Sequence, residues 1–249
     1  MDEEAKRFVF VCGCARSGTG ALAQLLASSD SVVIGMERFG HLVRPGRFTL
    51  APDCFEKDRF FNVRPGDTFY DDFDAFHRFD RRMREKFETA RYVGDKRPEF
   101  YEVYPELRAA FPGAKILFIY RNPVHVASSF HGRIKRGDNW PRGKDYRQAV
   151  VEWNRSVELT LQAADAGSDI ACVEYERAFR EGAKLNGILE FLGLPVDEGY
   201  STGVRRVLRR AAHLTSEREL LLTPQEVAYV CDRANLTLRD DLERITIAT

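Results

Sequence analysis

A short glycine-containing stretch near the start of the chain has residue types suited to binding an anion. Gly13 and Gly18 enclose four residues, and glycine permits the backbone conformations and close approach that an anion-binding loop needs. Arg16 adds a cation inside the stretch. A helix beginning directly after it would present unpaired N–H groups and the positive end of its dipole. The stretch therefore predicts a local site for phosphate or sulfate.

The same stretch has the shape of a P-loop but not its charge placement. A Walker A loop follows the pattern G-x-x-x-x-G-K-[ST], and its lysine contacts the terminal phosphates of the nucleotide. Here Thr19 stands where that lysine would be, and the cation lies earlier, at Arg16. On the loop alone, a tight strand-to-helix turn with a solvated arginine is an equally good interpretation.

The elements around the loop predict a parallel sheet. The apolar run at 8–12 is typical of a buried strand, and leucines at helical spacing predict a helix over 19–29. The run at 115–120 is nearly all apolar, as in a central parallel strand. Further strands are predicted at 31–34, 91–94 and 169–173, and further helices at 72–89, 99–111, 146–166, 183–192 and 223–234, with one more from about 124. The alternation predicts an α/β fold, a three-layer P-loop-like parallel sheet flanked by helices.

Length and charge fit a single domain over 1–249. Lys and Arg total 38, as do Asp and Glu, so the chain shows no bulk charge for nucleic acid or an anionic membrane. The cysteines are scattered, and Cys12-x-Cys14 lacks the spacing of metal ligands, so no metal site is expected. No apolar stretch has the length of a membrane span, and a cytoplasmic location is expected.

Residues 13–20 resemble the 5′-phosphosulfate loop of the sulfotransferases that use 3′-phosphoadenosine 5′-phosphosulfate (PAPS), often written P-R-S-G-T-T. The resemblance implies that the 5′-phosphosulfate is held by Arg16, Ser17, Gly18, Thr19 and Gly20. Two positions depart from the family pattern. Ala15 replaces the usual proline, and Gly20 offers a backbone N–H where the family often has a hydroxyl.

A second stretch, 121–129, is similar to the family's 3′-phosphate site. Arg121-Asn-Pro follows the strongest predicted strand, and Ser129 lies eight positions after Arg121. An arginine at the strand end and a serine on the next helix can both donate to one phosphate. A strand–turn–helix whose Pro123 only starts the helix is the structural alternative. The presence of both motifs in the expected order favours the phosphate site.

The resemblance also implies which residues carry out the transfer. Asp95-Lys96-Arg97-Pro98 is similar to the family's Asp-Lys-[Thr/Asp]-Pro segment, whose lysine lies beside the transferring group. Glu37 matches the general base of the tyrosylprotein branch, the branch whose motif spacing fits best, and His41 is the next candidate. A carboxylate can take a hydroxyl proton when burial raises its pKa. Lys96 and Arg16 would stabilise charge on the departing phosphate.

The implied activity is in-line transfer of a sulfuryl group from PAPS to an acceptor hydroxyl, which leaves 3′-phosphoadenosine 5′-phosphate (PAP) and needs no metal. The acceptor is expected to be a small molecule, a glycan or a peptide. The segment 36–72 has no clean period and is rich in aromatic residues and arginine, and it is predicted to form the acceptor pocket. A P-loop-type kinase and a nucleotide-binding module without transfer activity are the alternatives.

Four arginines follow the stretch that resembles the family. They could replace the C-terminal basic loop of the cytosolic sulfotransferases, which this chain lacks. Their pattern is nevertheless more typical of a solvated basic helix face. They are Arg205, Arg206, Arg209 and Arg210.

Overall fold

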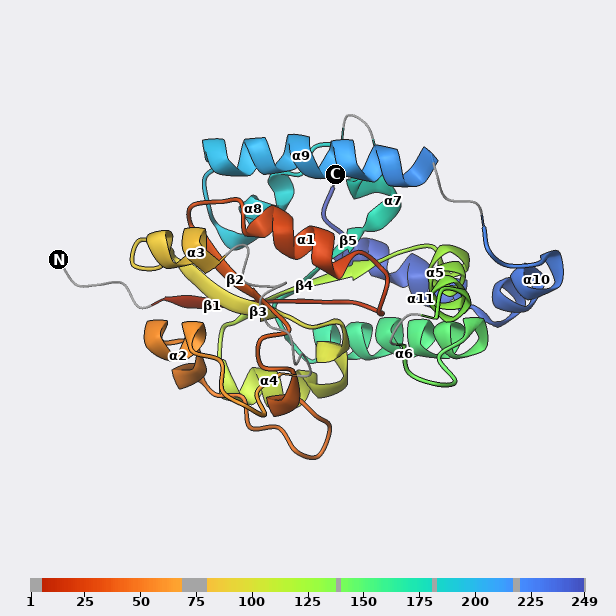
Figure 1. Ribbon diagram of the computed structural model, residues 1–249, viewed down its shortest axis with the longest axis horizontal. Helices are drawn as coiled ribbons and strands as arrows, with labels where there is room; N and C mark the ends of the chain where they lie inside the picture. Colours follow the sequence, from red (N-terminus) through yellow and green to blue (C-terminus); the bar gives the residue numbers. More distant parts are fainter. Residues whose placement is uncertain (1–5, 69–79, 138–139, 181–182, 217–219, 249) are drawn as a thin grey trace.

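The computed structural model describes residues 6–68, 80–137, 140–180, 183–216 and 220–248. Within these residues the chain forms one sheet of five parallel strands in the order β2-β3-β1-β4-β5 (Figure 1). The strands are β1 (Arg7–Cys12), β2 (Val32–Met36), β3 (Tyr92–Lys96), β4 (Lys115–Tyr120) and β5 (Ile170–Glu174). The predicted α/β fold and all five predicted strands are confirmed, since each run forms a strand within two residues of its expected bounds.

Helices cover both faces of the sheet (Figure 1). On one face lie α1 (Thr19–Leu26), α8 (Asn186–Leu192) and α9 (Glu198–Ser216). On the other lie α2 (Lys57–Phe61), α4 (Tyr104–Ala110) and α6 (Tyr146–Asp165). The remaining helices are α3 (Asp80–Lys86), α5 (Pro123–Lys135), α7 (Tyr175–Ala178), α10 (Pro224–Arg233) and α11 (Leu236–Asp241). None of the helices in the described ranges is both long enough and apolar enough to span a bilayer.

Some predicted helices differ from those observed. The helix expected over 99–111 is divided into a 3-10 helix, Pro98–Val103, followed by α4, because the backbone at Val103 leaves the helical conformation. The helix expected over 72–89 begins in residues that are not described, and its described part is α3. Of the long helix α9, only the basic face around its four arginines was expected, and its bounds were not predicted.

Four of the five phenylalanines of the segment 36–68 lie in the core, and Phe48 is partly buried against it. Phe39, Phe55 and Phe60 are at most 3% exposed. The Phe55 ring lies 5.5 Å from Phe39 and 5.8 Å from Phe10 of β1, in edge-to-face contacts that stabilise aromatic clusters. Their apolar surface is therefore used to hold the segment against the body of the molecule.

The parallel register brings the ends of four strands to one edge of the sheet. Lys96, the last residue of β3, lies beside Val11 of β1 and Met36 of β2. On the other side of β1, Cys12 lies beside Phe118 of β4. The loops after these strands contain the motifs singled out in the sequence, and ligands of parallel α/β sheets bind at this carboxyl edge.

Candidate active site

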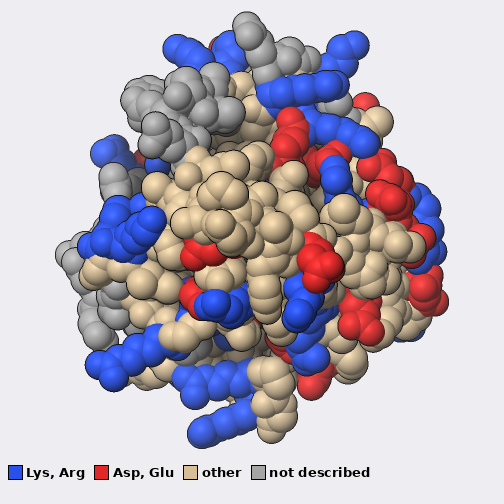
Figure 2. Space-filling model, turned by 90° about the vertical axis from the view of Figure 1, so that its right-hand side faces the viewer, with Lys and Arg blue, Asp and Glu red and all other residues tan. Residues whose placement is uncertain are grey.

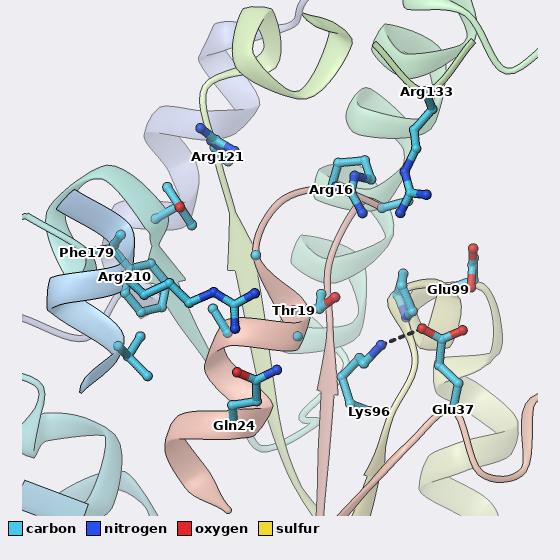
Figure 3. Close-up of a pocket in the computed structure, with 18 of the residues that line it drawn as sticks. Arg16, Thr19, Gln24, Glu37, Lys96, Glu99, Arg121, Arg133, Phe179 and Arg210 are labelled. Carbon is cyan, nitrogen blue, oxygen red and sulfur yellow. Dashed lines mark hydrogen bonds and ion pairs between the residues drawn. The ribbon is translucent and has the colours of Figure 1, made fainter. Parts of the chain in front are cut away.

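A cavity of about 470 Å³ lies at the carboxyl edge of the sheet. Arg16, Glu37, Lys96 and Arg121 all border it, and they come from the loops or ends of four different strands (Figure 3). The face of the molecule in Figure 2 shows acidic and basic side chains intermixed, so neither sign of charge covers it. The positive charge of the cavity is therefore a local feature.

The loop 13–20 depends on its glycines for its shape. Gly13 has φ 152°, and a Cβ there would lie 2.1 Å from the carbonyl oxygen of Ile119 in β4. Gly18 has φ 105°, and a Cβ there would lie 2.5 Å from the Tyr175 ring. Both positions thus require glycine for conformation and for space. The loop passes directly into α1 at Thr19, so the positive end of the helix dipole faces the cavity.

The loop residues differ in how they meet the cavity. Gly18, Thr19 and Gly20 border it. Ser17 is fully buried and is not among the lining residues, and its hydroxyl has no hydrogen-bond partner within the described part of the chain. Ser129 lies just behind the lining, where its Oγ accepts a hydrogen bond from Arg16 Nε at 3.0 Å. This bond connects the two predicted phosphate motifs, which lie far apart in the sequence.

Glu37 and Lys96 form an ion pair at the wall of the cavity (Figure 3). The Lys96 side chain is 6% exposed and that of Glu37 is 18% exposed, so both charges are shielded but still reach the cavity. The Glu37 backbone is left-handed, with φ 58°, and its N–H donates to the Lys96 carbonyl at 2.7 Å. In the described chain, Glu37 and Arg16 are the two non-glycine residues with positive φ, a strained conformation that is often found at functional sites.

A buried carboxylate, Asp95, holds the backbone around Glu37 and Lys96 in place. Its two oxygens accept hydrogen bonds from the backbone N–H groups of Lys96 (2.9 Å) and Phe39 (3.2 Å). Burial raises the pKa of Asp95 to about 6, although backbone hydrogen bonds from Phe39 and Arg38 and the charges of Arg38 and Lys96 oppose the rise. Gly35 leaves room for it, since a Cβ there would lie 2.7 Å from Asp95 Oδ1. Sequence reasoning missed Asp95, because its motif drew attention only to the lysine.

Arg121 is held at the opposite end of the cavity. Its guanidinium carbon lies 4.2 Å from the centre of the Tyr175 ring, and its Nε lies 3.7 Å from Glu176 Oε1. Burial alone would raise the pKa of Glu176, but hydrogen bonds from His125 and the Asn122 N–H hold that pKa below its usual value. The carbonyl of Arg121 accepts a hydrogen bond from the Trp153 indole at 2.8 Å. The start of α5 is thereby fixed around the arginine.

His41, the alternative base, does not border the cavity. It lies in the 3-10 helix Gly40–Leu42, and its ring contacts Arg44. Of the predicted acceptor segment, Glu37 is the one residue within 36–68 that borders this cavity, and 69–72 lie outside the described residues. The acceptor role of the segment stays a prediction, and this cavity gives it no support beyond Glu37.

Several lining residues were not foreseen. Trp140 packs edge-to-face on Phe130 with ring centres 5.0 Å apart, and its indole N–H donates to the Lys144 carbonyl at 2.8 Å. Arg205, Arg206, Arg209 and Arg210 are all exposed on α9, as expected of a solvated helix face, and Arg210 also borders the cavity. The other unforeseen residues with polar or aromatic side chains are Gln24, Glu99, Arg133, Lys144, Tyr175 and Phe179. They belong to no motif, so spacing in the sequence gave no signal for them.

Among the described residues, there is no group of three or more His, Cys, Asp or Glu side chains that could hold a metal ion. The chemistry that the lining offers is binding of an anion, stabilisation of negative charge and acceptance of a proton.

Several solved structures that this chain resembles in fold are sulfotransferases. The chain is similar to the sulfotransferase domain from the curacin biosynthetic pathway, with a TM-score of 0.54 and 15% identity over 98% of this chain and 93% of that one. It is also similar to the sulfotransferase domain of the Synechococcus PCC 7002 olefin synthase, with a TM-score of 0.53 and 19% identity over 93% and 96% of the two chains. The sulfotransferase STF1 from Mycobacterium tuberculosis H37Rv gives a TM-score of 0.51 and 17% identity over 94% and 78%. At these identities the likeness is one of fold.

Sequence comparison leads to the same family. None of the curated proteins matches this chain. The model of the sulfotransferase family, however, matches residues 9–198, which contain the glycine loop, the Glu37–Lys96 pair and Arg121. This chain therefore belongs to the sulfotransferase family.

Proposed function

We infer that this sulfotransferase takes its sulfuryl group from PAPS and moves it to an acceptor hydroxyl. The observation that carries the proposal is that Arg16, Lys96, Glu37 and Arg121 border one cavity at the carboxyl edge of the sheet. Six cations and two carboxylates belong to its lining: Arg16, Lys96, Arg121, Arg133, Lys144 and Arg210, with Glu37 and Glu99. Such an excess of positive charge, in a chain of zero formal net charge, suits a ligand with several negative charges.

The arrangement of the lining fits the two charged ends of PAPS. The N–H groups at the start of α1 and the Arg16 side chain would hold the 5′-phosphosulfate. Arg121 and Ser129 would hold the 3′-phosphate. The Arg16–Ser129 hydrogen bond supports the use of one ligand by both sets of residues, because it brings them next to one another. PAPS supplies the sulfuryl group, and the protein supplies position and charge.

Glu37 and Lys96 divide the chemistry of transfer. Glu37 takes the proton of the acceptor hydroxyl as the oxygen forms its bond to sulfur. The bond between sulfur and the bridging oxygen breaks, and its electron pair stays on the 5′-phosphate, which leaves as part of PAP. Lys96 and Arg16 stabilise that developing charge. The proton ends on Glu37, so atoms and charge balance without a metal or a covalent enzyme intermediate.

The ion pair between the two residues gives this division a physical basis. Before the donor binds, Lys96 and Glu37 neutralise one another. An incoming phosphosulfate competes for the Lys96 ammonium, and a lysine that turns toward the donor leaves the Glu37 carboxylate open to the acceptor hydroxyl. The carboxylate would therefore be released from its ion pair when the donor is in position.

Thermal unfolding with PAP tests the proposal. A ligand present at a hundred times its Kd adds about 2.7 kcal/mol to the stability of the folded chain. For a domain of this size that raises Tm by roughly 5–10 °C. Arg121→Ala should remove most of the rise, whereas Arg81→Ala, at a side chain 93% exposed, should leave it unchanged. A wild-type chain that ignores PAP, or one that responds more to ATP with Mg²⁺, would contradict the proposal.

A further inference from the structure

The helix α9 begins where the match to the sulfotransferase family ends. The family model stops at residue 198, and α9 runs from Glu198 to Ser216. It lies over the same face of the sheet as α1, the helix that follows the glycine loop (Figure 1). The match to the family model therefore assigns no role to any residue of α9 beyond its first.

Two glycines set how closely α9 approaches the end of α1. A Cβ on Gly203 would lie 1.9 Å from the Ser28 hydroxyl oxygen, and one on Gly199 would lie 2.5 Å from the Ser28 carbonyl oxygen. Any larger residue at either position would push the helices apart. The glycines are four residues apart, so they lie on one face of α9.

The same face leads from Ser28 to the cavity. Val207 follows Gly203 by four residues, and Arg210 and Ala211 follow it by seven and eight, which is about two helical turns or roughly 10 Å along the axis. Val207, Arg210 and Ala211 all border the cavity. The close contact at Gly203 therefore fixes the register that brings Arg210 to the cavity.

Arg210 reaches the cavity from the side opposite the catalytic pair. In Figure 3 its guanidinium points toward the glycine loop and the start of α1, and it lies across the loop from Lys96 and Glu37. Gln24 of α1 borders the same part of the cavity. A cation there faces the region assigned to the nucleotide rather than the region where the acceptor hydroxyl must meet Glu37.

We propose that α9 completes the nucleotide site and that Arg210 binds a phosphate group of the bound nucleotide. This rests on the proposed use of PAPS. Arg210 adds a third guanidinium to those of Arg16 and Arg121, and a planar guanidinium suits bidentate hydrogen bonding to phosphate. The packing of Gly203 on Ser28 positions the arginine and makes the affinity for the nucleotide depend on how α9 docks.

Calorimetric titration with PAP tests the role of Arg210. Arg210→Ala should weaken PAP binding by roughly ten- to a hundredfold, as expected for loss of a charged hydrogen bond. The matched control is Arg209→Ala, because Arg209 is an exposed arginine of the same helix that does not border the cavity. The difference between the two variants should narrow as ionic strength is raised, and Arg210→Lys should recover part of the affinity. Equal PAP affinities for Arg210→Ala and Arg209→Ala would overturn the assignment.

A second pair of variants tests the register without touching the cavity. Gly203→Ala should weaken PAP binding, because its Cβ displaces α9 from Ser28. Combining it with Ser28→Gly, which removes both side-chain atoms that the new Cβ would meet, should restore the affinity. Full PAP affinity in folded Gly203→Ala would overturn the dependence on docking, as would a double variant no better than the single one.

Failure of this inference is distinguishable from failure of the proposed function. A wild-type chain that does not bind PAP contradicts the use of PAPS itself. A wild-type chain that binds PAP, with Arg210→Ala binding it equally well, contradicts only the role of α9.

Discussion

The pair Glu37 and Lys96 joins a proton acceptor to a cation at one point of the cavity wall. Their positions come from backbone geometry as much as from side-chain packing. Glu37 keeps a left-handed φ of 58°, and its N–H is fixed to the Lys96 carbonyl. A backbone that is strained yet tightly bonded holds the carboxylate in place without relying on a particular ligand.

Glu37→Gln separates transfer from binding. Glutamine keeps the size of the side chain but cannot take a proton, so we expect release of PAP from PAPS to fall by about 10²- to 10⁴-fold with any hydroxyl acceptor that the wild type uses. The Tm rise given by PAP should persist, because Glu37 is not assigned to the nucleotide. His41→Ala serves as the control. Lost turnover in His41→Ala, with turnover retained in Glu37→Gln, would transfer the role of base to the histidine.

Asp95 predicts a pH dependence of stability. Burial raises its pKa in the folded chain to about 6, above the ordinary 3.8, so the folded state binds the proton more tightly than the unfolded state. The protonated carboxyl therefore favours folding below about pH 4, and this contribution is lost as the pH rises through about 6. Relative to Asp95→Asn, the wild type should lose up to about 3 kcal/mol of unfolding free energy across that window.

Urea unfolding of the two proteins at both ends of the window measures this loss. The amide of Asp95→Asn cannot accept from both Lys96 and Phe39, so the turn at Glu37 should also loosen and transfer should slow. A difference in stability that stays constant with pH would show that Asp95 is not held as described.

At the scale of elements, the turn that follows α1 is held by the buried amine of Lys86. Lys86 of α3 donates to the carbonyls of Ala27, at 2.8 Å, and Ser29, and Arg82 donates to that of Ser28 at 2.8 Å. These bonds give hydrogen-bond donors to the carbonyls of the three residues directly after the helix. Burial, aided by the charge of Arg82, lowers the pKa of Lys86 from 10.5 to about 7. The end of the helix that carries the glycine loop thus depends on a titratable group.

The stability contributed by Lys86 should rise with pH. Between its folded pKa of about 7 and its unfolded value of 10.5, the unfolded chain holds a proton that the folded chain has released. The unfolding free energy of the wild type, measured relative to Lys86→Met in urea, should therefore increase across that window. Lys57→Met, at an exposed lysine, is the control and should show no such trend. A trend shared by both variants would assign the effect to other groups.

The elements differ in how well the sequence predicted them. Strands such as 115–120 were predicted because a buried parallel strand is apolar throughout, and that pattern is local. Only the basic face of helix α9 was expected, because the packing of its glycines on Ser28 is a contact that only the folded chain brings about. For the same reason the sequence did not show that Phe39, Phe55, Phe60 and Phe61 are buried in the core, and the acceptor role of their segment stays a prediction.

Residues of the candidate site also differ in whether a local sequence pattern could point to them. Arg16, Glu37, Lys96 and Arg121 were found because they lie in short motifs at strand ends, and the parallel register brings those ends together. Arg210 and Trp140 come from segments without a motif, and their place in the cavity follows from tertiary packing. Asp95 was present in a recognised motif, but its role as a buried support depends on the fold of the turn above it.

At the scale of the whole molecule, charge is balanced overall and concentrated locally. The formal net charge is zero, while the cavity lining carries six cations and two carboxylates among the described residues. The rest of the chain therefore carries a small formal excess of negative charge, which reduces nonspecific binding of polyanions, and the local positive excess retains attraction for a small, highly charged ligand.

The affinity for PAP should therefore depend on salt. Raising the ionic strength from about 0.1 M to about 1 M shortens the Debye length from roughly 10 Å to roughly 3 Å, so the Kd for PAP should increase steadily. Arg121→Ala should show a smaller increase, because one of the screened contacts is already lost. Calorimetric titration over a salt series measures both slopes. Parallel slopes for the two proteins would argue that Arg121 does not contact a phosphate.

Both tryptophans of this chain belong to the neighbourhood of the cavity. Trp140 borders it, and the Trp153 indole donates to the carbonyl of Arg121. Indole emission responds to nearby charge and to the strength of its own hydrogen bond. The protein thus carries two intrinsic optical reporters close to its cavity, and occupancy by a nucleotide or an acceptor can be followed in the unlabelled wild type.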